Sequence, residues 1–264
     1  MIHPTAVVEQ GAQLGTNVSI GAMAYVGPHV VLGDNAVVKP QAHITGHTTI
    51  GANCKIYPFT VIGIEPQDLK YQGGDTRVEI GDNNTIREHT QIHAGVEQFG
   101  GVTKIGDNNL IMGNVHIAHD VIIHNHTIIV NAANLSGHVV VEDYAILGGA
   151  CGIHQFVRIG QHAMIGGMAA VERDVVPFSL VQGERSKVVG LNVVGLKRRG
   201  FDRDELNNLK QAMQAIFFGD ETLAARMEAL AADKTDSKVV KDLVDFVEGA
   251  AKRGLTQASD GARF

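Results

Sequence analysis

The sequence is poor in the residues that build disulfide frameworks and large aromatic cores. Its 264 residues include two cysteines, no tryptophan and only 5% aromatic side chains. Cys54 and Cys151 lie far apart and form no CxxC pair, which argues against a disulfide framework and against a cysteine zinc site. A reducing cytoplasm is therefore the expected setting.

Positive charge and long apolar runs are also scarce. The formal net charge is -6, so the chain lacks the basic field that neutralises the phosphates of a nucleic acid. No stretch approaches the roughly 18 consecutive apolar residues of a membrane-spanning helix. We therefore expect no nucleic-acid partner and no stable insertion into a membrane.

The sequence is rich in a repeat of period six. Aliphatic residues recur at every sixth position from Ile2 to Ile62, and a second tract runs from Ile105 to Val171. The fourth residue after each aliphatic is small or β-branched in almost every hexad, and glycine often follows the aliphatic directly, which suits a sharp corner with an unusual backbone conformation. Neither a helical nor a simple strand period explains a strict six. The pattern predicts a mainly β fold, a left-handed parallel β-helix with about 18 residues per coil.

The repeat also predicts the domain organisation. The hexads stop after Gly183, and residues 184–264 hold 14 of the 22 lysines and arginines but none of the 13 histidines. We expect the β-helix to span residues 1–183, with inserted loops at about 64–79 and 94–104. Loops on a rigid scaffold often carry binding groups, so both are candidate sites.

Residues 184–264 are expected to form a small α-helical C-terminal domain. Asp202 with Glu205 resembles a capping box at a helix start. Apolar residues at helical spacing then predict three helices that cap the open end of the solenoid. The last ten residues are expected to fray.

The coil length brings possible catalytic groups together. Residues about 18 apart stack in neighbouring coils, so His119 should lie beside Gly137 and its neighbour His138. An imidazole can deprotonate an attacking hydroxyl near neutral pH, and a glycine N–H can stabilise the resulting oxyanion. Asp120 or another acid is expected to orient the ring. Direct attack of a hydroxyl on a thioester needs no enzyme nucleophile.

Five motifs together resemble one family, the bacterial UDP-N-acetylglucosamine O-acyltransferases. They are HIAHD at 116–120, PQDLKY at 66–71, SGH at 136–138, HQF at 154–156 and GLNVVGLKRRGF at 190–201. The resemblance spans nearly the whole chain. It implies transfer of an (R)-3-hydroxyacyl group from acyl carrier protein to the glucosamine 3-hydroxyl of UDP-N-acetylglucosamine, the first committed step of lipid A assembly. It also implies a cytoplasmic homotrimer with active sites between subunits, and no cofactor.

The resemblance assigns roles at the predicted catalytic centre. His119 matches the general base, with Asp120 beside it, and Gly137 matches the oxyanion donor. His116 and His138 match histidines that contact the substrate.

Further matches concern the sugar nucleotide. Asp68 and Lys70 match residues that grip it, and His154 with Gln155 match further contacts. A lysine suits a diphosphate, whereas a glutamine suits uracil or sugar hydroxyls.

The last matches lie near the C-terminal part. Asn192, Arg198 and Arg199 match a segment that reaches the nucleotide from a neighbouring subunit. Gly167 matches the residue that limits the length of the acyl chain. A glycine leaves the groove open, which favours a chain of about twelve to fourteen carbons over ten, although each buried methylene contributes only about 0.8 kcal/mol.

Other activities fit the same repeat. One is another hexapeptide N- or O-acyltransferase, such as the N-acyltransferase of the same pathway or an acetyltransferase that uses coenzyme A. A second is a trimeric zinc enzyme of carbonic-anhydrase type, which uses three histidines of neighbouring coils and subunits, with His116, His119 and His138 as candidate ligands. A third is a purely structural solenoid, which would not respond to a sugar nucleotide. We expect no metal in the acyl-transfer reaction.

Overall fold

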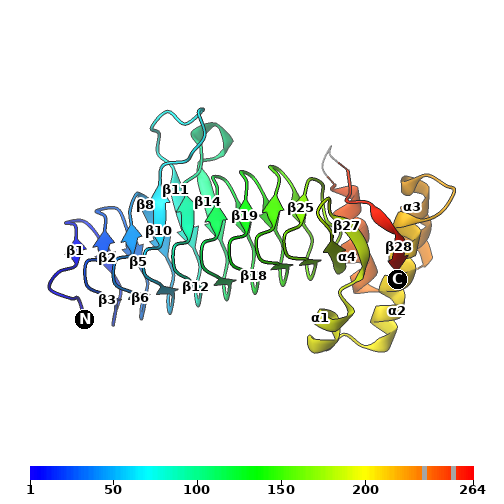
Figure 1. Ribbon diagram of the computed structural model, residues 1–264, viewed down its shortest axis with the longest axis horizontal. Coiled ribbons are helices and arrows are strands. Elements are labelled where there is room, and N and C mark those ends of the chain that lie inside the picture. Colours follow the sequence, from blue (N-terminus) through cyan, green and yellow to red (C-terminus); the bar gives the residue numbers. More distant parts are fainter. Residues whose placement is uncertain (234–236, 251–253) are drawn as a thin grey trace.

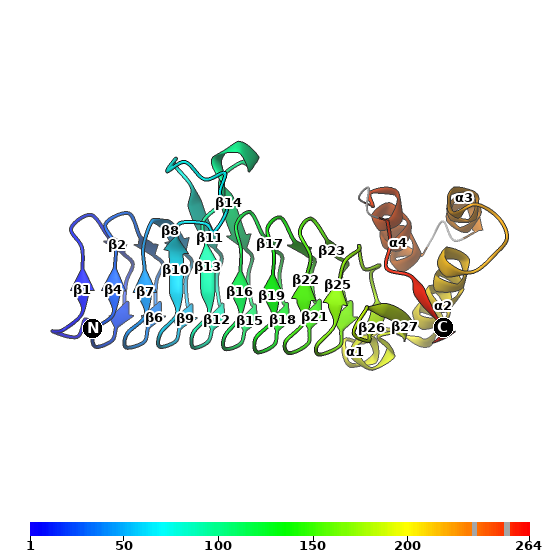
Figure 2. The ribbon, with the colours of Figure 1, turned by 45° about the horizontal axis from the view of Figure 1, so that its top comes forward.

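The protein folds as a parallel β-helix that ends in a group of helices (Figure 1). The computed structural model describes residues 1–233, 237–250 and 254–264. Short strands alternate with turns, so that three parallel sheets form the three sides of a long prism (Figures 1 and 2). The predicted β-helix with helices in the C-terminal part is confirmed.

The first two sheets are made of β-helix strands alone. In the order of pairing, the first contains β1 (Val7–Val8), β4 (Tyr25–Val26), β7 (His43–Ile44), β10 (Val61–Ile64), β13 (Gln91–His93), β16 (His116–Ile117), β19 (Asn134–Leu135), β22 (Gly152–Ile153) and β25 (Ala170–Val171). The second contains β2 (Gln13–Leu14), β5 (Val31–Leu32), β8 (His47–Ile50), β11 (Arg77–Ile80), β14 (Val102–Ile105), β17 (Ile122–Ile123), β20 (Val140–Val141) and β23 (Arg158–Ile159).

The third sheet continues beyond the hexads. It contains β3 (Ser19–Ile20), β6 (Val37–Val38), β9 (Lys55–Ile56), β12 (Thr85–Ile86), β15 (Leu110–Ile111), β18 (Ile128–Ile129), β21 (Ile146–Leu147), β24 (Met164–Ile165), β26 (Ser179–Gln182), β27 (Lys187–Leu191) and β28 (Ala258–Arg263). β27 turns back antiparallel to β26, so one hairpin crosses the expected boundary after Gly183. The division of the chain into two domains there stays a prediction.

The aliphatic positions of the hexads form the core. From Ile20 onward they are almost fully buried, whereas Ile2, at the open N-terminal end, is 48% exposed. Each fully buried isoleucine or leucine stabilises the fold by about 1.5 to 3 kcal/mol. Both cysteines are free and buried in the same core, and burial raises the pKa of the Cys151 thiol to about 11.

The corners are built differently from the expectation. The left-handed residue of the turn is not the glycine after the aliphatic but the residue two positions later, such as Asn35, whose φ is 57°. Gly33 is required for close approach instead, because a Cβ there would lie 2.6 Å from the carbonyl carbon of Gly51 in the next coil. Asparagine tolerates the left-handed conformation, and the Asn35 amide donates to the Asn53 side chain at 3.2 Å.

Two loops leave the β-helix on one side (Figures 1 and 2). The first loop, residues 65–76, joins β10 to β11, and the second loop, residues 94–101, joins β13 to β14 and contains a short 3₁₀-helix at Glu97–Phe99. Both are shorter than the interrupted stretches of the repeat, because β11 and β14 extend to four residues and pair with each other.

The C-terminal part contains four helices among the described residues, one more than expected. They are α1 (Val193–Arg198), α2 (Arg203–Phe217), α3 (Leu223–Asp233) and α4 (Lys238–Glu248). The capping box at the start of α2 is confirmed, because the Asp202 carboxylate accepts from the Glu205 amide and the Glu205 carboxylate from the Asp202 amide, both at 2.8 Å. No helix in the described ranges combines the length and apolar character needed to cross a bilayer.

The prediction that the last ten residues fray is wrong. β28 pairs in parallel with β27, with Val188 opposite Ala258. The physical reason is that β27 is otherwise an edge strand with free backbone donors and acceptors, which the C-terminal segment satisfies. The Phe264 ring also stacks on Phe217, with centroids 5.7 Å apart.

The close approach at Gly33 yields a test of the corner geometry. We expect Gly33→Ala to lower the stability by about 1 to 3 kcal/mol, because the added methyl group meets the backbone of the next coil. Gly152→Ala is the matched control, because nothing lies within 4 Å of a Cβ there. Thermal unfolding measures both variants. Equal melting temperatures would contradict this account of the corner.

A buried histidine gives the fold a dependence on pH. Burial, with Arg199 nearby, lowers the pKa of His162 to about 4, while the unfolded chain has a histidine pKa of about 6.5. As pH falls through this window the unfolded state binds a proton that the folded state does not, so stability falls. From about pH 7 to pH 5 we expect the wild type to lose about 2 kcal/mol more than His162→Phe. Denaturant unfolding at both pH values measures the difference, and parallel losses would refute it.

Candidate active site

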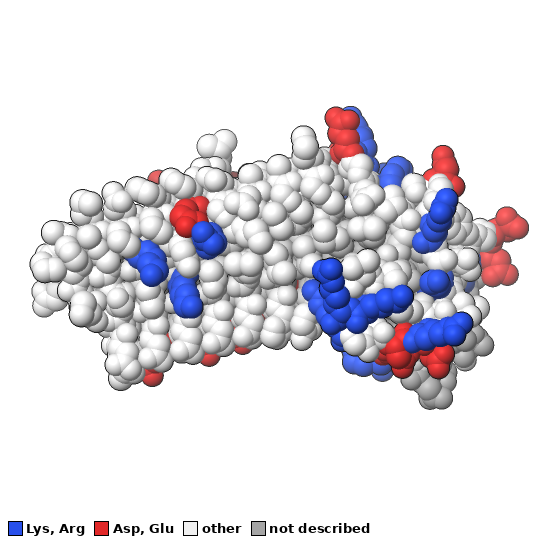
Figure 3. Space-filling model, turned by 60° about the horizontal axis from the view of Figure 1, so that its bottom comes forward, with Lys and Arg blue, Asp and Glu red and all other residues white. Residues whose placement is uncertain are grey.

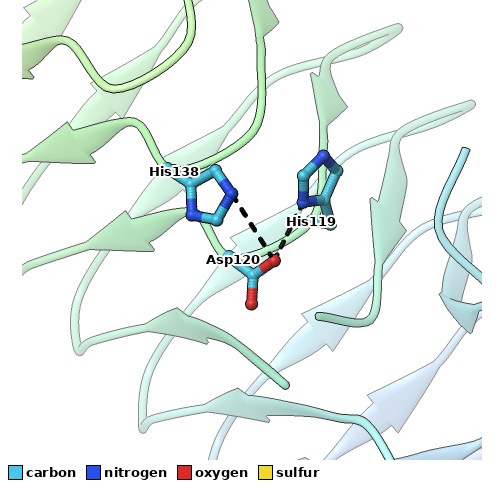
Figure 4. A group of neighbouring side chains, drawn as sticks. All are labelled: His119, Asp120 and His138. Carbon is cyan, nitrogen blue, oxygen red and sulfur yellow. Dashed lines mark hydrogen bonds and ion pairs between the residues drawn. The ribbon is translucent and has the colours of Figure 1, made fainter. Parts of the chain in front are cut away.

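A buried imidazole and carboxylate form the centre of the site (Figure 4). His119 lies just after β16, and its Nδ1 donates to Oδ2 of Asp120 at 2.8 Å. Both side chains are buried, with 7% and 5% of their surfaces exposed. Because Nδ1 carries the proton that is donated, the neutral ring has an unprotonated Nε2, which can accept a proton.

Asp120 is itself fixed by the second loop and by β14. Its carboxylate accepts from the Val96 amide at 3.1 and 3.3 Å, and its own amide donates to Oγ1 of Thr103 at 2.9 Å. Asp120 has a φ of 56°, the left-handed conformation that recurs at the corners. The buried carboxylate is therefore held in one orientation against the imidazole.

Gly137 lies against the His119 ring, as the 18-residue spacing predicts. A Cβ at Gly137 would be 2.5 Å from both Cε1 and Nε2 of the imidazole, so a larger residue would displace the ring. The adjacent amides of Ser136 and His138 are engaged, each at 3.1 Å. The Gly137 N–H has no partner in the described part of the chain, which leaves it available to a ligand.

A pocket of about 210 Å³ opens beside these groups. His116, His119, Gly137 and Gln155 line it, so the structure brings these predicted residues together. Burial, followed by the neighbouring His93, lowers the pKa of His116, so the ring is neutral at pH 7. The exposed His154 is close by, with its Nδ1 3.2 Å from the Gln155 carbonyl oxygen.

His138 lies between two aromatic rings. It stacks on Phe156 with centroids 4.4 Å apart, and it meets Phe99 edge to face at 4.6 Å. Its Nε2 is 4.0 Å from Oδ2 of Asp120. Burial lowers the pKa of His138, and the carboxylate of Asp120 offsets this only in part. His138 is therefore a neutral hydrogen-bonding group.

The first loop brings two more of the predicted residues to the site. Oδ2 of Asp68 is 3.4 Å from Nε2 of His119, on the side of the ring opposite Asp120. The Lys70 amide donates to Oδ1 of Asp68 at 2.9 Å, and its ammonium nitrogen lies 5.0 Å from the centre of the Phe99 ring. His119 thus lies between two carboxylates.

Three predicted residues lie elsewhere in the chain. Asn192 is buried and caps α1, accepting from the Gly195 amide at 3.1 Å and donating to the His162 carbonyl at 3.0 Å. Arg199 packs over the Tyr144 ring at 5.3 Å, while Arg198 is exposed. Basic side chains gather at this end of the molecule (Figure 3). None of the three lines the pocket beside His119.

Gly167 follows β24 in an exposed turn. A Cβ placed there would lie 3.2 Å from the Gly149 carbonyl oxygen, a tight contact, so a side chain at this position would need a small shift of the neighbouring coil. The next residue, Met168, is 78% exposed, so the turn carries a large apolar side chain beside Gly167.

Several residues of the site were not among those predicted from the sequence. Phe156 follows His138 by 18 residues, and Asn134, which lines the pocket, follows His116 by 18, so the coil spacing contains the signal for both. The buried His93 also lines the pocket, and its Nδ1 donates to the Glu65 carbonyl at 2.8 Å. Phe99 lies in the second loop, where no repeat signals its position.

Within a single chain, the three histidines named for the zinc alternative do not come together as one set. In the described ranges, the side chains that could share a metal ion are His119, Asp120 and His138, whose ligand atoms lie within 4.8 Å of one another. His116 is not among them. The set is two imidazoles and a carboxylate, and the carboxylate already accepts the His119 Nδ1 proton.

Family models match two parts of the chain. One described as UDP N-acetylglucosamine O-acyltransferase, domain 2, matches residues 174–256. Another, of bacterial transferase hexapeptide repeats, matches residues 29–63 and 103–137. These segments correspond to the C-terminal part and to two stretches of the β-helix.

Curated relatives match along nearly the whole chain. A protein of Sulfurovum sp. is 47% identical over 254 residues, 96% of each chain. One of Rhizobium johnstonii is 40% identical over 262 residues, 99% of this chain and 96% of that one. Both are named acyl-(acyl-carrier-protein)-UDP-N-acetylglucosamine O-acyltransferase.

Solved structures agree with these matches. The UDP-N-acetylglucosamine acyltransferase from Campylobacter jejuni is 41% identical, covers 98% of this chain and all of its own, and has a TM-score of 0.92. The enzyme from Francisella novicida is 37% identical, covers 99% and 95%, and has a TM-score of 0.94. On sequence and fold together, the chain belongs to the UDP-N-acetylglucosamine O-acyltransferase family.

Proposed function

We propose that this protein transfers an (R)-3-hydroxyacyl chain from acyl carrier protein to the glucosamine 3-hydroxyl of UDP-N-acetylglucosamine, the first step of lipid A biosynthesis. The observation that carries the proposal is the buried His119 ring, with Nδ1 bonded to Asp120 at 2.8 Å and Nε2 beside Gly137. This arrangement suits a general base next to an oxyanion donor.

The reaction proceeds by direct transfer. Nε2 of His119 takes the proton from the sugar hydroxyl while its oxygen attacks the thioester carbonyl carbon. The Gly137 N–H donates to the oxyanion, and the carboxylate of Asp120 stabilises the imidazolium that forms. When the intermediate collapses, the carbon–sulfur bond breaks and the His119 proton passes to the departing thiolate. The products are the acylated sugar nucleotide and the free carrier thiol, so no cofactor is needed.

The surrounding side chains suit the sugar nucleotide. Asp68 and Lys70 of the first loop, lying beside the catalytic ring, bind sugar hydroxyls and phosphate oxygens. The neutral imidazoles of His116 and His138 offer uncharged donors and acceptors to the sugar. His154 and Gln155 supply further polar contacts at the same pocket.

A homotrimer would complete the site. Asn192, Arg198 and Arg199 lie away from the His119 pocket of their own chain, so they bind the nucleotide only if a neighbouring subunit brings them there. The flat sides of the prism suit contact between identical chains. A cytoplasmic location gives the enzyme both soluble substrates.

Replacement of the base tests the reaction. We expect His119→Gln to lower kcat by a factor of about 100 to 10,000, because proton removal from the hydroxyl loses its acceptor. His124→Gln is the matched control, because His124 is exposed. Mass spectrometry of product from UDP-N-acetylglucosamine and a panel of 3-hydroxyacyl carrier proteins measures the rates. A variant that keeps wild-type kcat would refute the role of His119.

The same assay tests the substrate pair. Folded wild-type protein that yields no product with any carrier-bound donor would overturn the proposal. Product obtained only with coenzyme A thioesters would indicate a different hexapeptide acyltransferase.

Gly167 gives a separate test of chain length. We expect the wild type to prefer donors of about twelve to fourteen carbons, and Gly167→Leu to shift the optimum to shorter chains, because a side chain there would block the groove. Relative rates with donors of about ten to sixteen carbons measure the optimum, and the shortest donor is the internal control. A wild-type optimum at about ten carbons would contradict the prediction.

A further inference from the structure

The two inserted loops touch each other above the catalytic centre. They rise together from the same side of the β-helix (Figures 1 and 2), and the first loop carries Asp68 and Lys70. A loop of this kind needs tethers, because its backbone groups are not paired in a sheet. The tethers therefore decide where the two substrate-binding side chains lie.

The tip of the first loop is not held by burial. Leu69 is fully exposed, as is typical of a residue without packing neighbours. A short turn is formed within the loop, in which the Tyr71 amide donates to the Asp68 carbonyl at 3.1 Å. This turn fixes the positions of Asp68 and Lys70 relative to each other, but it does not attach them to the β-helix.

Glu97 of the second loop attaches the first loop to the second, through residues that follow this turn in the sequence. Its carboxylate accepts hydrogen bonds from the backbone amides of Gly74 and, at 3.4 Å, Gln72. A Cβ at position 74 would overlap the Glu97 side chain, so glycine there lets the carboxylate approach this backbone in the conformation found. Hydrogen bonds from its own backbone amide, then from Gly74 and Gln72, lower the pKa of the Glu97 carboxyl. The Glu97 carboxylate is thus ionised at neutral pH, and we refer to its hydrogen bonds with the amides of Gln72 and Gly74 as the clamp.

The same 3₁₀-helix makes a second contact with the first loop. Phe99, two residues after Glu97, receives the Lys70 ammonium over its ring at 5.0 Å and packs against His138 at 4.6 Å. The helix Glu97–Phe99 thus touches both the first loop and a histidine of the site. Its backbone is fixed in turn, because the Val96 amide donates to Asp120.

We propose that Glu97 is a positioning residue for the sugar-nucleotide site: its carboxylate holds the backbone at Gln72 and Gly74 so that Asp68 and Lys70 stay beside His119. The inference rests on the proposed function, in which these two side chains bind the sugar nucleotide. Glu97 itself touches neither the reacting atoms nor His119. It acts through the first loop alone.

Hydrogen exchange tests the clamp without any substrate. In Glu97→Ala we expect backbone amides of residues 67–75 to exchange about tenfold faster or more, because the loop opens more often. The matched control is Gln98→Ala, which removes an exposed side chain of the same 3₁₀-helix and should exchange as the wild type does. Unchanged exchange in Glu97→Ala would overturn the inference, and so would equal acceleration in both variants.

Steady-state kinetics test the consequence for binding. We expect Glu97→Ala to raise KM for UDP-N-acetylglucosamine about tenfold, with kcat changed less than about threefold and KM for the acyl carrier unchanged. Glu97→Gln should restore much of the binding, because its amide oxygen still accepts from the two backbone groups. A general loss that affects both KM values and kcat alike would indicate a merely structural role and overturn the inference.

A combined variant separates this mechanism from an independent effect of Glu97. If Glu97 acts through Asp68 and Lys70, Glu97→Ala should raise KM by less than about twofold when Asp68→Ala and Lys70→Ala are both already present. If Glu97→Ala raises KM by the same factor in this background as in the wild type, the inference is overturned. Failure of the proposed function is distinct, because it would appear as an inactive wild type, while the exchange experiment still reports on the clamp.

Discussion

Parallel backbone pairing between successive coils is the constraint on which the rest of the structure depends. His116 lies opposite Asn134, and Ile117 opposite Leu135, so each inward and outward side chain has a fixed neighbour one coil away. The His119 ring rests on Gly137 and the His138 ring on Phe156 for this reason. The centre is thus built on rigid backbone, and only the groups above it come from loops.

The part of the site that follows the repeat could be predicted from the sequence. His119, Gly137 and His138 were brought together by spacing alone, and their contacts agree with it. Inside the loops the spacing is lost, because inserted residues have no partner one coil away. Resemblance pointed to Asp68 and Lys70, but the hydrogen bonds of Glu97 and the packing of Phe99 depend on how two irregular segments meet.

The fold shows the same division between periodic and irregular sequence. The period of six predicts the β-helix, because every coil must fill the same cross-section. The expectation that the glycine after each aliphatic supplies the unusual backbone conformation of the corner was wrong. Gly33 is required because it lies close to Gly51, not because of its own conformation. The period also contained no signal for β28, whose pairing with β27 depends on a free strand edge far away in sequence.

The repeat of whole coils has a consequence for how such a molecule can change over evolution. Each coil adds about 4.8 Å to the axis of the prism, and its corners and core are similar from one coil to the next. A coil gained or lost between Gly137 and α1 would therefore move the two proposed ligand-binding regions apart or together in a fixed step. Neither region would need different residues. The distance between the two regions along the axis and the chemistry within each region can therefore change independently during evolution.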